Sequence, residues 1–152
     1  MKAVVQRVTA SSVSVDGAVT GSIGKGFNIL LGVSEDDTSK DAEILAAKIA
    51  KLRIFEDENE KMNLSLLDIG GEVLVISQFT LCADIKKGNR PSFIQAAPPD
   101  KATELYECFM EQLKSNGVKK VAHGVFGADM AVEISNDGPV TIIMDTEIWR
   151  KG

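Results

Sequence analysis

A chain of 152 residues, 44% hydrophobic and 26% charged, is long enough for one domain with a buried core and has the composition of an ordinary globular protein. Its net charge of −5 argues against binding nucleic acid through bulk electrostatic attraction. No apolar run approaches the ~20 residues that a membrane helix needs, and Arg7 interrupts the first apolar segment, which lacks a signal-peptide pattern. We therefore expect a single cytoplasmic domain over residues 1–152 with no membrane partner.

The first half of the chain predicts strands followed by a helix. Residues 3–10 read as a strand, and the alternation that follows leads into Asp16-Gly17, a tight hairpin signal. The nearly continuous apolar run from Phe27 to Val33 predicts a strand that is buried on both faces. Helical spacing of apolar residues then predicts a helix over 38–52, with Asp41 favouring its N-terminal end.

The remaining elements complete an α+β pattern. We expect strands at 52–55 and 72–81, an irregular segment at 82–97, a helix over 98–115, and strands at 118–126, 130–135 and 140–148. The last two strands are joined by Asn136–Pro139, which reads as a hairpin turn. The sum is an α+β domain with two helices and a mostly antiparallel sheet that is strongly curved or closed into a β-barrel.

The sequence has few of the residues and motifs that standard catalytic or metal-binding sites use. The single histidine, His123, is best interpreted as a structural strand residue, and Cys82 and Cys108 as small buried side chains rather than as a disulfide or a nucleophile. There is no Gly-x-Ser-x-Gly elbow, and the acidic run 56–58 lacks the ligand spacing of a calcium loop. We expect no metal site and no cofactor.

Two breaks in strand-like runs are the best candidates for a site. In Ser77–Leu81 a polar cluster follows an apolar strand: either the strand simply leaves the core, or backbone N–H groups near Phe79 and Thr80 come free of the ladder and can hold an oxyanion. In Asn136–Thr141, Gly138-Pro139 is either a plain turn or, with a cis bond, a rigid wall of carbonyl groups. From the residues alone the structural interpretation of each segment stays open.

Together the two segments resemble the paired signatures of the D-aminoacyl-tRNA deacylase family, and the resemblance covers the whole chain. Ser77 and Phe79 match the D-specific branch, because related deacylases with relaxed chirality begin this motif with proline and lack the phenylalanine. Further similar segments are Met1–Val8, Leu52–Phe55, Lys61–Asn63, Asn89–Phe93 and Gly124–Met130.

The resemblance implies a homodimer that hydrolyses the ester of D-aminoacyl-tRNA, with active sites at the subunit interface. It implies that Gly138-Pro139 is a cis dipeptide that reaches into the partner's pocket and rejects L-substrates, while glycyl-tRNA is also cleared. The implied catalytic segment is Ser77, Gln78, Phe79 and Thr80, and the implied supporting residues are Asn136, Thr141, Arg7, Phe126, Ala128 and Met130.

Several alternatives stay open. Water activated with the help of the RNA 2′-hydroxyl competes with a Thr80 nucleophile as the mechanism. A non-catalytic dimeric RNA-binding module and a hydrolase of small D-amino-acid esters are the rival functions. Because the chain is acidic, we expect contact with the tRNA acceptor end alone, through some of Lys86, Lys87, Arg90, Lys119 and Lys120.

Overall fold

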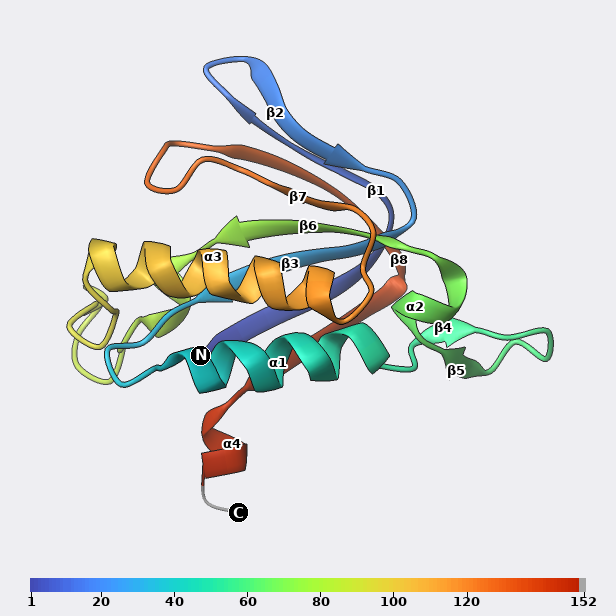
Figure 1. Ribbon diagram of the computed structural model, residues 1–152. Helices are drawn as coiled ribbons and strands as arrows, with labels where there is room; N and C mark the ends of the chain where they lie inside the picture. Colours follow the sequence, from blue (N-terminus) through green and yellow to red (C-terminus); the bar gives the residue numbers. More distant parts are fainter. Residues whose placement is uncertain (151–152) are drawn as a thin grey trace.

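The computed structural model describes residues 1–150 (Figure 1). Its strands are β1 (Lys2–Val15), β2 (Ala18–Ile23), β3 (Gly26–Gly32), β4 (Phe55–Glu56), β5 (Met62–Leu64), β6 (Glu72–Ser77), β7 (Val121–His123) and β8 (Ala131–Asp145). Its helices are α1 (Ser39–Lys51), α2 (Leu66–Ile69), α3 (Pro99–Ser115) and α4 (Glu147–Arg150), and η1 (Phe79–Cys82) is a 3₁₀-helix.

One mixed sheet carries the fold. β1 pairs antiparallel with β8 along one edge and with β3 and then β2 along the other, whereas β3–β6 and β6–β7 are parallel pairs. The sheet curves until β2 approaches β7, and a Cβ on Gly21 would lie only 2.7 Å from the carbonyl oxygen of His123. The result is a nearly closed, barrel-like sheet.

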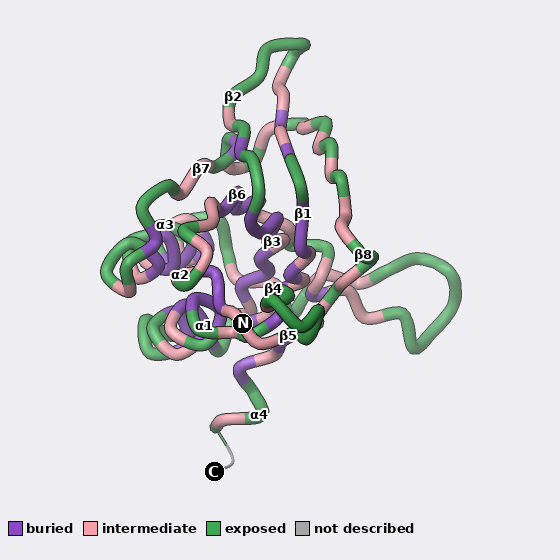
Figure 2. Tube along the Cα trace, turned by 90° about the vertical axis from the view of Figure 1, so that its right-hand side faces the viewer, coloured by how far each residue is buried: buried purple, intermediate pink, exposed green. Residues whose placement is uncertain are grey.

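Two helices cover one face of this sheet, α1 lying beside α3 (Figure 1). Parallel strand pairs need long crossovers, and α1 and α3 lie in the crossovers of the two parallel pairs. Their apolar stripes, which include Leu45, Ile49, Phe109 and Leu113, are fully buried against the strands. A second, smaller apolar cluster fills the inside of the curve and includes Val8, Leu74 and Ile76. In Figure 2 the buried residues, drawn in purple, gather in the central strands and in α1 and α3.

A buried polar network joins the two ends of the described chain. The Met1 ammonium donates to the Asp37 carboxylate at 2.6 Å and to the Thr146 hydroxyl at 2.8 Å. Thr146 in turn donates to Asp41 at 2.7 Å, and Arg150 contacts Asp37 and Asp41. Burial raises the pKa of the Asp41 carboxyl, but hydrogen bonds from Thr146 and Thr38 and the guanidinium of Arg150 outweigh it and hold the pKa at about 2.

The sequence predictions are confirmed for the α+β class, the barrel-like sheet, the Asp16-Gly17 hairpin and the two long helices. The sheet is more mixed than expected because two of its strand pairs, β3–β6 and β6–β7, are parallel. The expected strand at 52–55 is wrong, since extended pairing is confined to Phe55–Glu56, and the strand from residue 72 ends at Ser77, where η1 follows. The final strand ends at Asp145, and α4 follows it.

The predicted hairpin at Asn136–Pro139 is also wrong. β8 is a single strand that stays paired with β1 on both sides of this segment, Val8 with Asn136 and Gln6 with Thr141. Only Arg7 lies between these pairs on β1, whereas residues 137–140 lie between them on β8. The extra residues form a bulge, and the chain continues in the same direction.

Within residues 1–150, no helix combines the length and the apolar character that crossing a membrane requires.

Candidate active site

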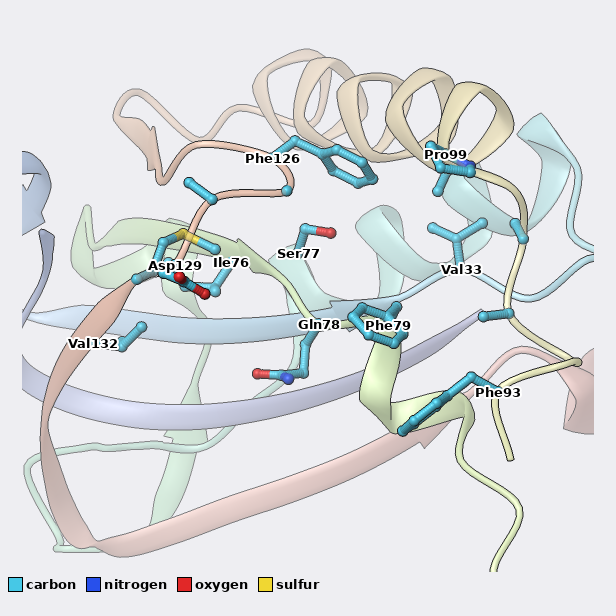
Figure 3. Close-up of a pocket in the computed structure, with 16 residues that line it drawn as sticks. Val33, Ile76, Ser77, Gln78, Phe79, Phe93, Pro99, Phe126, Asp129 and Val132 are labelled. Atoms are coloured by element: carbon cyan, nitrogen blue, oxygen red, sulfur yellow. The ribbon is translucent and has the colours of Figure 1, made fainter. Parts of the chain in front are cut away.

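A pocket of about 620 Å³ opens where β6 ends (Figure 3). Three segments form most of its wall: the end of β6 with the start of η1, the start of α3 with the chain before it, and the loop between β7 and β8. The lining residues are Val33, Ile76, Ser77, Gln78, Phe79, Phe93, Ala96, Ala97, Pro99, Ala102, Phe126, Gly127, Ala128, Asp129, Met130 and Val132.

The backbone changes its hydrogen bonding at the edge of this pocket. The Gln78 N–H donates to the Leu31 carbonyl at 2.8 Å, and the first bond of η1 runs from the Leu81 N–H to the Gln78 carbonyl at 3.2 Å. The N–H groups of Phe79 and Thr80 lie between these two bonds and precede the first bond of the helix. The segment therefore presents two adjacent backbone donors that its own helix does not use.

Gly32 on β3 allows η1 to lie this close to the sheet. A Cβ at Gly32 would lie 2.9 Å from the Leu81 Cβ and 3.1 Å from the Gln78 carbonyl oxygen. Because real Cβ atoms essentially never approach within 3.0 Å of another atom, a side chain here would displace η1. Gly32 supports the site but was not identified from the sequence, where it lies inside an apolar run without a signal of its own.

The side chains of the first segment divide between the pocket and its rim. Ser77, Gln78 and Phe79 line the pocket, whereas Thr80 is exposed outside the lining, where its hydroxyl accepts a hydrogen bond from the Gln78 amide. Phe79 is 55% exposed although it is aromatic, and its ring meets the edge of Phe93 at a centroid distance of 5.1 Å. These two rings form an apolar rim that is open to solvent (Figure 3).

The opposite wall is held in place from beneath by α3. Phe126, Ala128 and Met130 line the pocket on this side. The ring of Phe126 packs on Tyr106, whose buried hydroxyl donates to the Val75 carbonyl at 2.8 Å. Burial raises the pKa of the Tyr106 hydroxyl, which therefore stays a donor. Tyr106 was expected only as part of a helix, although a buried tyrosine generally needs such a partner.

The bulge of β8 is a second structured segment, and Arg7 anchors it. Arg7 is 5% exposed and donates to the Ile54 carbonyl at 2.8 Å and to the Asp137 carbonyl at 3.3 Å. The Asp137 carboxylate also lies 3.3 Å from the Arg7 Nε. The guanidinium thus holds the first half of the bulge against the sheet.

Asn136 closes the base of the same bulge. Its side-chain amide donates to the carbonyls of Arg7 and Val140, each at 3.0 Å, and its oxygen accepts from the Thr141 hydroxyl at 3.4 Å. The Gly138-Pro139 peptide between these anchors is cis, and both residues are exposed. Gly138 has a φ of +120°, a conformation that L side chains rarely adopt.

The structure therefore places the expected residues in two groups. Ser77, Gln78, Phe79, Phe126, Ala128 and Met130 surround the pocket, with Thr80 just outside its lining. Gly138 and Pro139 lie in the β8 bulge, Asn136 and Thr141 flank it, and Arg7 of β1 packs against it. No residue of the bulge is among the lining residues of the pocket in the same chain. The tip of the bulge, Gly138-Pro139, is exposed on the surface of the protomer.

Few titratable groups surround the pocket. Asp129 is the one ionisable side chain among the lining residues. His123 is exposed outside the lining, with its Nδ1 2.7 Å from the Gly124 carbonyl oxygen, and the thiol of Cys82 is buried near the Val33 carbonyl. Across residues 1–150, no three or more His, Cys, Asp or Glu residues gather as a metal site would require. What the pocket offers is backbone donors, neutral polar side chains and one carboxylate.

The family model described as D-Tyr-tRNA(Tyr) deacylase matches residues 4–145. Proteins named D-aminoacyl-tRNA deacylase are 60% identical in Clostridium botulinum (strain 657 / Type Ba4), over 96% of this chain and 97% of the relative, and 63% identical in Sulfurihydrogenibium sp. (strain YO3AOP1), over 97% and 99%.

Solved structures repeat the whole fold. A structure titled c-Myc DNA Unwinding Element Binding Protein is 48% identical, with a TM-score of 0.90 over 95% of this chain and 98% of that one. A structure titled as a probable eukaryotic D-amino acid tRNA deacylase is 17% identical, with a TM-score of 0.81 over 94% and 97%, and it supports the fold alone. On its family match and the identity of its relatives, the chain belongs to the D-Tyr-tRNA(Tyr) deacylase family.

Proposed function

We propose that this enzyme hydrolyses the ester bond between a D-amino acid and tRNA, and that residues 1–152 act as one deacylase domain. The observation that carries the proposal is the pocket at the end of β6. Ser77, Gln78 and Phe79 line it, and the N–H groups of Phe79 and Thr80 at its edge are not used by the hydrogen bonds of η1. The family of the chain supports the same reaction. Because tRNA is charged in the cytoplasm, we propose that the enzyme acts there.

The reaction needs little from side chains because an aminoacyl ester is already activated. The oxygen of a water molecule attacks the carbonyl carbon, and the N–H groups of Phe79 and Thr80 stabilise the charge that develops on the carbonyl oxygen. The bond from the carbonyl carbon to the ribose oxygen then breaks, and that oxygen takes up a proton. Orientation of the ester in the pocket supplies much of the acceleration.

The water route is favoured over a Thr80 nucleophile by the position of Thr80. Its side chain lies outside the pocket lining, and its hydroxyl is engaged as an acceptor by the Gln78 amide. Within residues 1–150, no histidine or lysine lines the pocket to take the hydroxyl proton. We propose instead that the 2′-hydroxyl of the terminal adenosine helps to orient and deprotonate the water.

Chirality is proposed to come from a second copy of the chain. The Gly138-Pro139 tip is exposed and anchored by Arg7 and Asn136, yet it lies outside the pocket of its own protomer. In a homodimer it would reach the partner's pocket and face the Cα of the bound amino acid. An L side chain would then collide with its carbonyl groups, whereas a D side chain would point away from them.

Selection at Cα predicts a broad range of substrates. The identity of a D side chain should matter little, because it does not meet the wall. Glycine has no side chain to collide, so glycyl-tRNA should also be hydrolysed. Rejection by collision reaches several kcal/mol, whereas one methylene in a pocket contributes about 1–3 kcal/mol.

Contact with RNA is proposed to be limited to the acceptor end. Lys86, Lys87 and Arg90 are exposed on the loop that precedes Phe93, at the rim of the pocket. Lys119 and Lys120 are also exposed, although Lys120 lies 3.7 Å from the Glu72 carboxylate and is partly neutralised. With few phosphates contacted, affinity should depend only shallowly on salt concentration.

Hydrolysis of D-tyrosyl-tRNA and L-tyrosyl-tRNA by the purified protein, with a chelator present, tests the proposal. We expect rapid loss of the D-ester alone. If neither ester is cleaved faster than in buffer, a non-catalytic nucleic-acid-binding module becomes the better account. Turnover of a small D-amino-acid ester as fast as the tRNA ester would instead favour a hydrolase that does not require RNA.

A further inference from the structure

The α-ammonium group of Met1 lies inside the protein, just before β1, and the proposed reaction makes no use of it. The ion pair that it forms with Asp37 is fully buried on both sides, and Met1 as a whole is 2% exposed and belongs to the main apolar core. The Met1 carbonyl also accepts from the Thr146 N–H at 2.9 Å. The first residues of a domain are usually poorly ordered unless they are tied down, so burial of this depth assigns the ammonium group a specific role.

The cluster around this ammonium group is electrically balanced. Two carboxylates, Asp37 and Asp41, meet two cations, the Met1 ammonium and the Arg150 guanidinium. The Thr146 hydroxyl connects the two halves, because it accepts from the ammonium and donates to Asp41. A neutral group in place of the ammonium would leave two carboxylates facing one guanidinium. Such a loss is strongly destabilising, because the remaining buried charge has neither its partner nor water.

The loop that carries Asp37 also holds one wall of the pocket. The second oxygen of the Asp37 carboxylate accepts from the Ser34 N–H at 2.7 Å, and the Asp37 N–H donates to the Ser34 carbonyl at 3.1 Å, which closes the turn after β3. Next to this turn, the Val33 carbonyl accepts from the Ala97 N–H at 2.9 Å, and both of these residues line the pocket. The ammonium group of Met1 therefore stabilises the turn beside the pocket as well as the core.

We infer that a free α-amino group at Met1 is required for a stable fold, which places hydrolysis of an N-formyl group before folding. An N-formyl nitrogen keeps one N–H but carries no charge, so it cannot balance Asp37. In the hydrolysis, water adds to the formyl carbon, the C–N bond breaks, formate leaves, and the amine takes up the proton that is released. Because the nitrogen is buried once the chain has folded, a deformylating hydrolase has to act on the chain before that point.

Cell-free translation that starts with formylmethionyl-tRNA, with or without an added peptide deformylase, yields the matched pair of chains, and mass spectrometry verifies each. We expect the formylated protein to melt about 10 °C lower, and hydrolysis of D-tyrosyl-tRNA should be lost at a correspondingly lower temperature. A second variant carries Gly-Ser ahead of Met1, which keeps the terminal charge but moves it two residues away. It should melt like the formylated protein, and it provides the measurement if the formylated chain does not fold.

Lys2→Gln is the matched control, because it removes a positive charge from the neighbouring residue, which takes part in no ion pair within residues 1–150. It should shift the melting temperature by no more than about 2 °C. In Asp37→Asn the difference between formylated and free chains should shrink, because the carboxylate is gone.

Two results would overturn the requirement for a free amino group. One is equal melting temperatures for the free wild-type chain and its formylated and extended forms. The other is a difference between formylated and free chains that stays equally large in Asp37→Asn. If the free wild-type protein does not hydrolyse D-tyrosyl-tRNA, the proposed function fails instead, and the melting temperatures still decide about Met1.

Discussion

Replacing Gly138 by alanine puts a methyl group where the β8 bulge has no room for one. The new Cβ would lie 2.9 Å from the Arg7 Nη2, 2.9 Å from the Val140 Cγ2 and 3.2 Å from the Val140 nitrogen. The φ of +120° adds backbone strain of about 1–3 kcal/mol for a residue with a side chain. Because Arg7 is itself buried and bonded, we expect the tip to move rather than the anchor.

The expected cost appears in both stability and activity. The free energy of unfolding should fall by about 1–3 kcal/mol, and a displacement of about 1 Å at the reacting centre lowers the rate about a hundredfold. Denaturant unfolding measures the first quantity, and single-turnover hydrolysis of D-tyrosyl-tRNA measures the second. Circular dichroism confirms that the variant remains folded at the assay temperature.

Gly17→Ala is the control for backbone strain. Gly17 has a φ of +81°, yet a Cβ there would meet no atom within 4 Å, and the hairpin that contains it is remote from the bulge in the sheet. This variant should be destabilised without losing activity. A folded Gly138→Ala enzyme with the wild-type rate would refute the argument that this segment belongs to the site.

Three further predictions follow from other contacts. Arg7→Met leaves the Ile54 and Asp137 carbonyls without their donor, so unfolding should become easier by about 1–3 kcal/mol in a denaturant titration, with loss of D-selectivity in the deacylation assay. Thr80→Val should retain most of the hydrolysis rate, and a loss of several orders of magnitude would support the nucleophile route instead. The Asp41 pKa lies near 2 in the folded protein and near 3.8 in the unfolded chain, so its contribution is complete above pH 4 and is lost as the pH falls toward 2. Thermal melting from pH 5 to pH 2 should show this loss in the wild type and a smaller one in Asp41→Asn.

Local patterns predicted the elements because each element depends mostly on its own residues. The Asp16-Gly17 turn, the apolar run of β3 and the periodicity of α1 are all short-range signals, and the structure confirms each of them. The Asn136–Pro139 segment shows where such signals fail. The same turn-forming residues serve a hairpin or a bulge, and the pairing of β8 with β1, more than a hundred residues away in sequence, decides between them.

Short-range signals also predicted part of the candidate site. Ser77–Leu81 stood out because polar residues follow a buried strand, and the bend into η1 at that point agrees with it. Gly32 and Tyr106 had no such signal, because their importance comes from close contacts with segments distant in sequence: Gly32 with Gln78, just after β6, and Tyr106 with Val75 on β6. Contacts between distant segments are invisible in one sequence without a known fold.

The central claim is that Ser77–Thr80 of one protomer and Gly138-Pro139 of its partner form a single deacylation site. A heterodimer purified with two tags tests it, one chain carrying Gly138→Ala and the other Phe79→Ala. If each site combines two protomers, one of the two sites in this heterodimer is intact, and hydrolysis of D-tyrosyl-tRNA should return to about half of the wild-type rate, well above the rate of either parent homodimer, in which both sites carry a substitution. If each protomer carries a complete site, the heterodimer stays as slow as its parents, and the account is contradicted.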